Sequence, residues 1–189
     1  MKFIKKIMIV ATSLMLLYTL AACNNNKVGP SLKASKKTSI QKEDTVADRV
    51  NAPSLVKSGK VGSIQLTANN GKAIGPDIKY MPEWRAFGWF TAVDRVEWDV
   101  DVEETGNYSV DLEWAVSDEE AGKEFLLQSK DQQLTGIVEK SGSWETFKKA
   151  PVGSIHLEAG VQKLVFRSNK NFDKGAMLDF RAMELVRLK

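Results

Sequence analysis

Cysteine and histidine are nearly absent from this sequence, which contains one of each, Cys23 and His156. A single thiol cannot close a disulfide within the chain, so the stability of the folded part has to come from its apolar core. The chain also lacks the clustered Cys and His ligands of a zinc site. It contains neither a glycine-rich phosphate loop nor a nucleophile elbow. These absences argue against disulfide scaffolds, zinc enzymes, nucleotide-binding folds and serine hydrolases.

The first 23 residues have the pattern of a secretory signal. Three lysines precede an apolar run over 7–20, which is shorter than an ordinary transmembrane helix. The tetrapeptide Leu-Ala-Ala-Cys that ends at Cys23 resembles the lipobox of bacterial lipoproteins. The resemblance implies a signal peptide over 1–22 and a Cys23 that is acylated, for example with palmitate, and becomes the new N-terminus. The alternative is an ordinary signal peptide followed by an incidental cysteine.

A polar segment over 24–57 follows, rich in Lys, Ser and Asn and poor in aromatic residues. Such a composition does not bury enough apolar surface to offset the entropy of ordering, so we expect residues 23–57 to be the lipidated cysteine and a flexible tether. A lipid on Cys23 would anchor the chain to a membrane of the cell envelope, facing the periplasm or the cell surface.

Charge argues against a nucleic-acid partner. The formal net charge of +3 includes the three lysines of residues 1–22, without which 24 basic and 24 acidic residues remain. The segment 24–57 holds seven basic and three acidic residues, which leaves 17 basic and 21 acidic residues, a net charge of −4, in 58–189. A mildly acidic domain without a basic stripe is not expected to bind nucleic acid.

Residues 58–189 follow a period of two, which is typical of strands with one buried and one solvated face. The runs 95–104 and 107–117 alternate in this way on either side of a turn at Gly106, with Trp98 and Trp114 on the apolar faces. Further strands are expected at 63–68, 124–129, 133–138, 144–149, 154–157, 162–168 and 177–188. Many short strands at this spacing predict one all-β domain, an antiparallel β-sandwich. The last strand has apolar residues on both faces, so it is expected to be central or bulged.

The stretch Tyr80–Phe90, with the sequence YMPEWRAFGWF, follows neither the strand nor the helix period, although five of its residues are aromatic. We interpret it as a loop at one end of the sandwich. Phe87, Trp89 and Phe90 are expected to close the end of the core. Trp84, which lies between two charged residues, is the aromatic residue most expected to be exposed.

The order of several short motifs resembles the carbohydrate-binding modules of families 6 and 35. These motifs are Gly106-Asn107-Tyr108, Gly142-Ser143-Trp144, Leu157-Glu158-Ala159-Gly160 and the final-strand Asp179, and the resemblance covers residues 64–188. It implies a jelly-roll, galactose-binding-like β-sandwich of the kind appended to secreted glycan-active proteins.

The same resemblance implies where a sugar would bind. Members of these families bind sugars at the loop end of the sandwich, between an aromatic residue that precedes the strand at 95 and the tryptophan of the Gly-Ser-Trp motif. In this chain the first position corresponds to the aromatic run, Tyr80–Phe90, and the second to Trp144. The ligand-binding residues predicted on this basis are Trp84 and Trp144, followed by Tyr80 and Trp89.

A structural calcium is a further expectation of the resemblance. Many members hold calcium with two glutamates on the first strand and an aspartate on the last. Here Gln65 and Thr67 stand in the place of the glutamates, and fewer charges mean weaker calcium binding. We therefore predict no cofactor and no metal, with Asp179, Gln65 and Thr67 as weak candidates; Asp179 alternatively satisfies a buried network. The asparagine that often contacts sugar before the last strand is also missing.

These observations predict a membrane-anchored lipoprotein whose non-catalytic domain binds a glycan or polysaccharide through loop aromatics. The alternative is an interaction or structural module of the envelope, with the same fold, a protein partner and no sugar site. An enzyme that cleaves glycans would need two carboxylates facing one cleft, and no such pair is indicated. His156 lies in an apolar strand pattern and is not expected to act as a general base.

Overall fold

The computed structural model describes residues 50–59 and 62–189. The signal segment 1–22, Cys23 and most of the predicted tether lie outside the described residues. The strands are β1 (Val56–Lys57), β2 (Ser63–Thr67), β3 (Lys72–Ile74), β4 (Lys79–Met81), β5 (Ala86–Gly88), β6 (Arg95–Val102), β7 (Gly106–Ala115), β8 (Glu124–Ser129), β9 (Gln132–Ile137), β10 (Lys148–Leu157), β11 (Gly160–Ser168) and β12 (Asp179–Arg187). None of the chain described here forms a helix long and apolar enough to cross a membrane.

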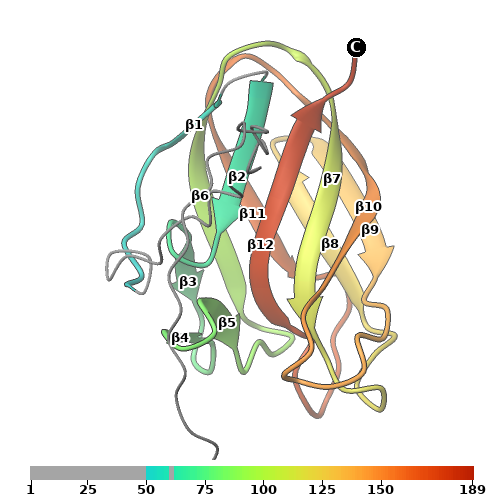
Figure 1. Ribbon diagram of the computed structural model, residues 1–189. Helices are drawn as coiled ribbons and strands as arrows, with labels where there is room; N and C mark the ends of the chain where they lie inside the picture. Colours follow the sequence, from blue (N-terminus) through green and yellow to red (C-terminus); the bar gives the residue numbers. More distant parts are fainter. Residues whose placement is uncertain (1–49, 60–61) are drawn as a thin grey trace, which may run out of the picture. The chain divides into compact units, whose positions relative to one another are not determined.

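The strands form two six-stranded sheets (Figure 1). The first sheet has the order β1-β6-β11-β8-β9, with β3 also pairing with β6, and the second has the order β10-β7-β12-β5-β4, with β2 also pairing with β12. Strand pairs are antiparallel apart from the short parallel pair of β1 and β6. The β-sandwich predicted from the period of two is therefore confirmed.

The core lies between the two sheets and is rich in aromatic rings. The ring of Phe180 on β12 lies 5.3 Å, centroid to centroid, from both Trp98 on β6 and Phe166 on β11, so it contacts the facing sheet. Trp98 and Trp114 are fully buried, as their strand patterns predicted. Burying a large apolar side chain stabilises the fold by about 1.5–3 kcal/mol, and these rings replace the disulfides that the sequence cannot form.

Strand β12 is both central and bulged, as the sequence indicated. It lies between β7 and β5, and the register with β7 shifts between Phe180 and Ala182. A bulge puts two residues of one strand opposite one of its partner, which re-aims the side chains beyond it. The extra residue explains why apolar side chains change faces along this strand, and it lies close to Asp179 at the beginning of β12.

Residues 50–57, which composition placed in the tether, belong to the fold. Val56 is buried, and β1 pairs with the edge of β6. The amide Nδ2 of Asn51 donates hydrogen bonds to the carbonyl oxygens of Ala68 and Gly71, each at 2.8 Å. A boundary at residue 58 is therefore too late. Composition missed these residues because they are held by hydrogen bonds to distant backbone and by one buried side chain.

The aromatic run is a short hairpin and not the loop that we expected. Strands β4 and β5 pair through Tyr80 and Phe87, and the turn between them ends at Arg85, which has a φ of 49°. The hairpin was missed because each of its strands has only three residues, too few to show a period. The strand expected at 144–149 begins only at Lys148, since residues 144–147 form a turn and loop, and it continues through 154–157 as one strand, β10, with a bulge after Pro151.

Candidate functional site

The β4–β5 hairpin and the loops before β10 and β12 meet at the end of the sandwich opposite the C-terminus (Figure 1). Residues of these segments line a pocket of about 280 Å³. Its lining residues are Met81, Trp89, Trp144, Ala176 and Asp179. They come from three parts of the chain that are far apart in the sequence. The pocket therefore exists only once the strands have paired.

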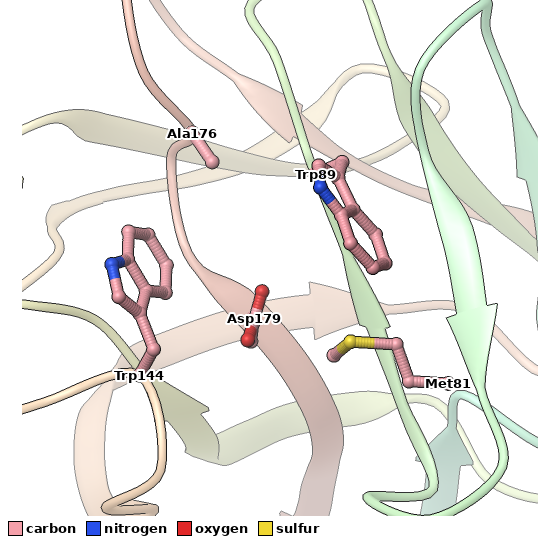
Figure 2. Close-up of a pocket in the computed structure, with 5 residues that line it drawn as sticks. All are labelled: Met81, Trp89, Trp144, Ala176 and Asp179. Carbon is pink, nitrogen blue, oxygen red and sulfur yellow. The ribbon is translucent and has the colours of Figure 1, made fainter.

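Two indole rings form opposite walls of this pocket. Figure 2 shows Trp89 and Trp144 on either side of Asp179, with Met81 beside Trp89 and Ala176 on the opposite rim. Trp89 is 56% exposed, an unusual fraction for a tryptophan, whereas Trp144 is half-buried and packs against the core. Expecting Trp89 to fill the core was therefore wrong, although Phe87 and Phe90 are buried as expected.

The backbone at Trp89 is strained. Its φ is 53°, in the left-handed region that glycine adopts easily and a bulky side chain adopts at a cost of about 1–2 kcal/mol. Since more than half of the side chain is exposed, packing does not fully offset this strain. Strained residues that point into pockets are characteristic of binding sites, so the conformation supports a ligand-binding role for Trp89.

A buried aspartate holds the segment that follows Trp89. The carboxylate of Asp94 accepts hydrogen bonds from the backbone N–H and the hydroxyl of Thr91, at 2.8 and 2.7 Å, and from the N–H of Asp77 at 3.3 Å. The N–H of Met177 donates to the carbonyl of Phe90 at 2.6 Å. These bonds tie the Trp89 side of the pocket to the loop before β12.

The turn that carries Trp144 is anchored by Ser141. Its hydroxyl accepts from the N–H of Val116 at 2.8 Å and donates to the carbonyl of Val116 at 2.9 Å. Within the turn, the hydroxyls of Ser143 and Thr146 lie 2.9 Å apart. The Gly-Ser-Trp motif is thus a fixed turn at the end of β7, and it holds Trp144 in place without involving its ring.

Lys123 holds the loop that supplies Ala176, which lines the pocket beside the two indole rings. Its ammonium donates to the carbonyl of Ala176 at 3.0 Å, pairs with the carboxylate of Glu120, and lies 5.0 Å from the centre of the Phe172 ring. The side chain is largely buried, so these contacts take place away from bulk water. A single lysine therefore connects the loop after β7 with the loop that supplies Ala176.

Asp179 lies at the floor of the pocket and is 9% exposed. Burial raises the pKa of its carboxyl from the ordinary 3.8 to about 7, because the charged form is poorly solvated there. Gly88 on β5 makes room for it: a Cβ at that position would lie 3.0 Å from Asp179 Oδ1 and 2.8 Å from Met81 Sδ. The floor is thus a carboxyl group that is close to half-ionised at neutral pH.

A second hollow of about 330 Å³ lies next to the first and shares Trp89 and Ala176 with it. Its other lining residues are Asp77, Thr91, Phe172, Asp173, Lys174 and Gly175. Trp89 therefore stands between two adjoining hollows. Such an arrangement fits a ligand longer than one ring.

The structure brings together two of the four predicted ligand-binding residues, Trp89 and Trp144. Trp84 does not line the pocket: its ring stacks on Phe147 at 6.1 Å, and its carbonyl accepts a hydrogen bond from Arg181. Tyr80 is also outside the lining, with its ring packed edge-on against Phe87 at 5.7 Å. Preferring Trp84 as the exposed platform was therefore wrong, since stacking covers part of its ring.

Sequence reasoning did not find Met81, Ala176 or the pocket position of Asp179. Met81 and Ala176 are ordinary apolar residues without a local signal. Asp179 was singled out, but as a weak calcium ligand or a member of a buried network. Its place between two indoles follows from the pairing of β12 with β5, which no local pattern encodes.

The three weak metal candidates do not converge. Thr67 and Gln65 pair with Ala182 and Glu184 on β12, so Asp179 lies three residues further along the strand, roughly 10 Å away. Thr67 Oγ1 accepts a hydrogen bond from the N–H of Asn70. Among the described residues no three His, Cys, Asp or Glu side chains form a group suited to a metal ion. His156 lies on β10, with Nδ1 3.1 Å from Asn107 Oδ1.

Comparison with known proteins bears on the fold. No known family profile matches the sequence, and no curated protein matches it. The family 35 carbohydrate-binding module from Clostridium thermocellum matches with a TM-score of 0.54 and 11% identity, over 67% of this chain and 98% of that module. The C-terminal family 6 module of a laminarinase from Zobellia galactanivorans matches with a TM-score of 0.55 and 13% identity, over 66% of this chain and 99% of that module.

A third match is a carbohydrate-binding module of lichenase 5A from Cellvibrio mixtus, solved in complex with cellotriose. It has a TM-score of 0.52 and 13% identity, over 66% of this chain and 97% of that module. Identities this low establish a shared fold and nothing about ligands. The folded part of this chain therefore has the β-sandwich fold of the family 6 and family 35 carbohydrate-binding modules, as its motifs predicted.

Proposed function

We propose that this protein is a membrane-anchored lipoprotein whose single β-sandwich domain binds a glycan between Trp89 and Trp144. The observation that carries the proposal is the pocket with an indole on each side and a buried carboxyl at its floor. Indole faces are flat and apolar and fit the C–H faces of a pyranose ring, while a polar group at the floor fixes a hydroxyl or another polar substituent.

The proposed role is binding without catalysis. Hydrolysis of a glycosidic bond usually requires two carboxyl groups on either side of the scissile bond. Of the five described residues that line the pocket, Asp179 is the one with an ionisable side chain. A shallow pocket of this kind would hold a single sugar weakly, and many anchored copies would retain a polymer through multivalency.

Anchoring is proposed from the sequence around Cys23, where a lipobox-like tetrapeptide follows a signal-like segment. If Cys23 is acylated, the residues between Cys23 and the domain would be the linker that connects the domain to the membrane. The test is incorporation of labelled palmitate into the wild-type chain and into Cys23→Ser, with fractionation of the cells. Label and membrane association that are lost in Cys23→Ser support the anchor, whereas unlabelled wild-type protein in the soluble fraction contradicts it.

The sugar site is tested by native affinity electrophoresis of residues 24–189 through gels that contain different soluble polysaccharides. Trp89→Ala and Trp144→Ala are run beside wild type, with Trp84→Ala as the matched control because Trp84 lies outside the pocket. Removing an aromatic anchor typically weakens binding by about 2 kcal/mol, or roughly 30-fold. We expect one polymer to retard wild type and Trp84→Ala but not the two pocket variants.

Circular dichroism of each variant shows whether the fold is intact. If no polysaccharide retards the wild-type chain, the sugar site is refuted and the interaction module of the envelope becomes the better account. If retardation is lost in Trp84→Ala and kept in the pocket variants, the domain binds glycan through another surface.

A further inference from the structure

The pocket combines two features that a neutral sugar does not require together. Its walls are indole rings, and its floor carries an acid that the fold has removed from water. Cations bind over indole faces, most strongly where water is excluded, and a carboxylate is the natural counter-charge for an ammonium group. One wall already has such a contact, because the ammonium of Lys79 lies 5.5 Å from the centre of the Trp89 ring.

We propose that this pocket selects a sugar residue that bears a free, protonated amino group, with Asp179 as its counter-ion and Trp89 and Trp144 packed against the ring. The inference rests on the proposed sugar site and adds the chemical class of the ligand. It predicts that N-acetylation of the amino group, which removes the charge, weakens binding.

The acid itself supports this selectivity. A buried carboxylate without a partner destabilises a fold, and such groups are usually paired with a cation or hydrogen-bonded. Burial is the cause of the raised pKa of Asp179, without a contribution from a neighbouring charge. An incoming ammonium would supply the missing partner, and the carboxyl would release its proton to solvent as the ion pair forms.

Charged groups on the surrounding elements do not replace that partner. These groups are Lys79 on β4, Glu145 beside Trp144, Asp173 and Lys174 in the loop before β12, and Arg181 on β12, which pairs with Glu113 on β7 at 2.9 Å. Arg181 also stacks on Phe147, with its guanidinium carbon 3.4 Å from the ring centre, and is therefore engaged elsewhere. The adjoining hollow adds the carboxylates of Asp77 and Asp173 against the single cation Lys174, so it does not favour an anionic ligand.

The experiment is isothermal titration of residues 24–189 with three β-1,4-linked glucosamine tetramers: the free amine, the N-acetylated form and the N-trimethylated form. The trimethylated probe keeps its charge at every pH, so its pH dependence reports the protein alone. If only the ionised carboxyl binds it, its affinity rises about 50-fold between pH 5 and pH 7, because the ionised fraction rises from about 1% to about 50%. The free amine follows this rise until it loses its own proton.

Asp179→Asn tests the assignment, and Asp131→Asn is the matched control because Asp131 is an exposed carboxylate in the turn between β8 and β9, outside the lining of both hollows. We expect Asp179→Asn to remove the pH dependence and the preference for charged probes, and Asp131→Asn to keep both. Equal or tighter binding of the N-acetylated tetramer overturns the inference, as does a pH dependence that survives in Asp179→Asn. In either case the sugar site stands if the pocket tryptophans are still required. If no tetramer binds and no polysaccharide retards the protein, the sugar site fails as well.

Discussion

The floor of the pocket makes a stability prediction that needs no ligand. An unfolded Asp179 loses its proton near pH 3.8, whereas the folded carboxyl loses it near pH 7. Between these values the folded state binds more protons than the unfolded state, so the free energy of unfolding falls as pH rises. Well above pH 7 both states are ionised, and this contribution becomes constant.

The size of the effect follows from the same pKa values. Each pKa unit corresponds to about 1.4 kcal/mol, so the difference between the folded and unfolded carboxyl sets an upper limit of about 4 kcal/mol at high pH. Between pH 5 and pH 8 the loss amounts to about 3 kcal/mol, and somewhat less if water that enters the pocket solvates the carboxylate. The substitution Asp179→Asn keeps the shape and removes the titration.

The assay is urea denaturation of residues 24–189 at pH 5 and pH 8, followed by tryptophan fluorescence. Other titrating groups are common to both proteins, so the informative quantity is the stability of Asp179→Asn minus that of wild type. We expect this difference to increase by about 2–3 kcal/mol from pH 5 to pH 8, in favour of the variant. A difference that stays constant, or that decreases with pH, refutes the assignment of a desolvated and unpaired carboxyl at this position.

Three further predictions concern the parts that support the pocket. Asp94→Asn is expected to destabilise the domain by about 1–3 kcal/mol, because the amide cannot accept all the hydrogen bonds from Thr91 and the neighbouring backbone. This effect has the opposite sign to that of Asp179→Asn. Urea denaturation at pH 7 measures it, and an unchanged stability contradicts the role of this carboxylate. Lys123→Met is expected to lower the free energy of unfolding by about 1–3 kcal/mol and to weaken glycan retardation, because it removes the largely buried contacts of the ammonium group. The control Lys130→Met breaks an exposed ion pair and is expected to change the free energy of unfolding by less than about 1 kcal/mol. Equal effects of the two substitutions would show that the buried contacts of Lys123 do not matter. Val56→Ala is expected to destabilise the domain by about 1–2 kcal/mol in the same denaturation assay, because Val56 is buried. No loss of stability is expected if the fold begins at residue 58.

The alternating pattern of the sequence determined much of the fold. Side chains along a strand point alternately to the two faces, so a run such as 95–102 states which residues are buried before any partner strand is known. The burial of Trp98 and Trp114 was predictable for this reason. The motif around Trp144 was also informative, since a turn formed by glycine and serine is encoded within a few residues.

Which aromatic ring is free to bind a ligand was decided only by the tertiary structure. Trp84 and Trp89 belong to one aromatic run, and nothing local shows that Trp84 stacks on Phe147 while Trp89 takes a left-handed backbone and projects beside the pocket. The contact that covers Trp84 comes from a residue more than sixty positions away. Local periodicity cannot report contacts of that range.

The chemistry of Asp179 has the same origin. The sequence shows an aspartate at the beginning of a strand, where a solvated carboxylate, a calcium ligand and a buried acid look alike. Three features together remove the carboxyl from water. Strand β12 pairs with β5, β5 passes close to the carboxyl at Gly88, and the turn that carries Trp144 covers it from the other side. Desolvation depends on everything that surrounds a group, so the sequence placed this acid on the last strand and only the folded chain made it an acid with a pKa of about 7.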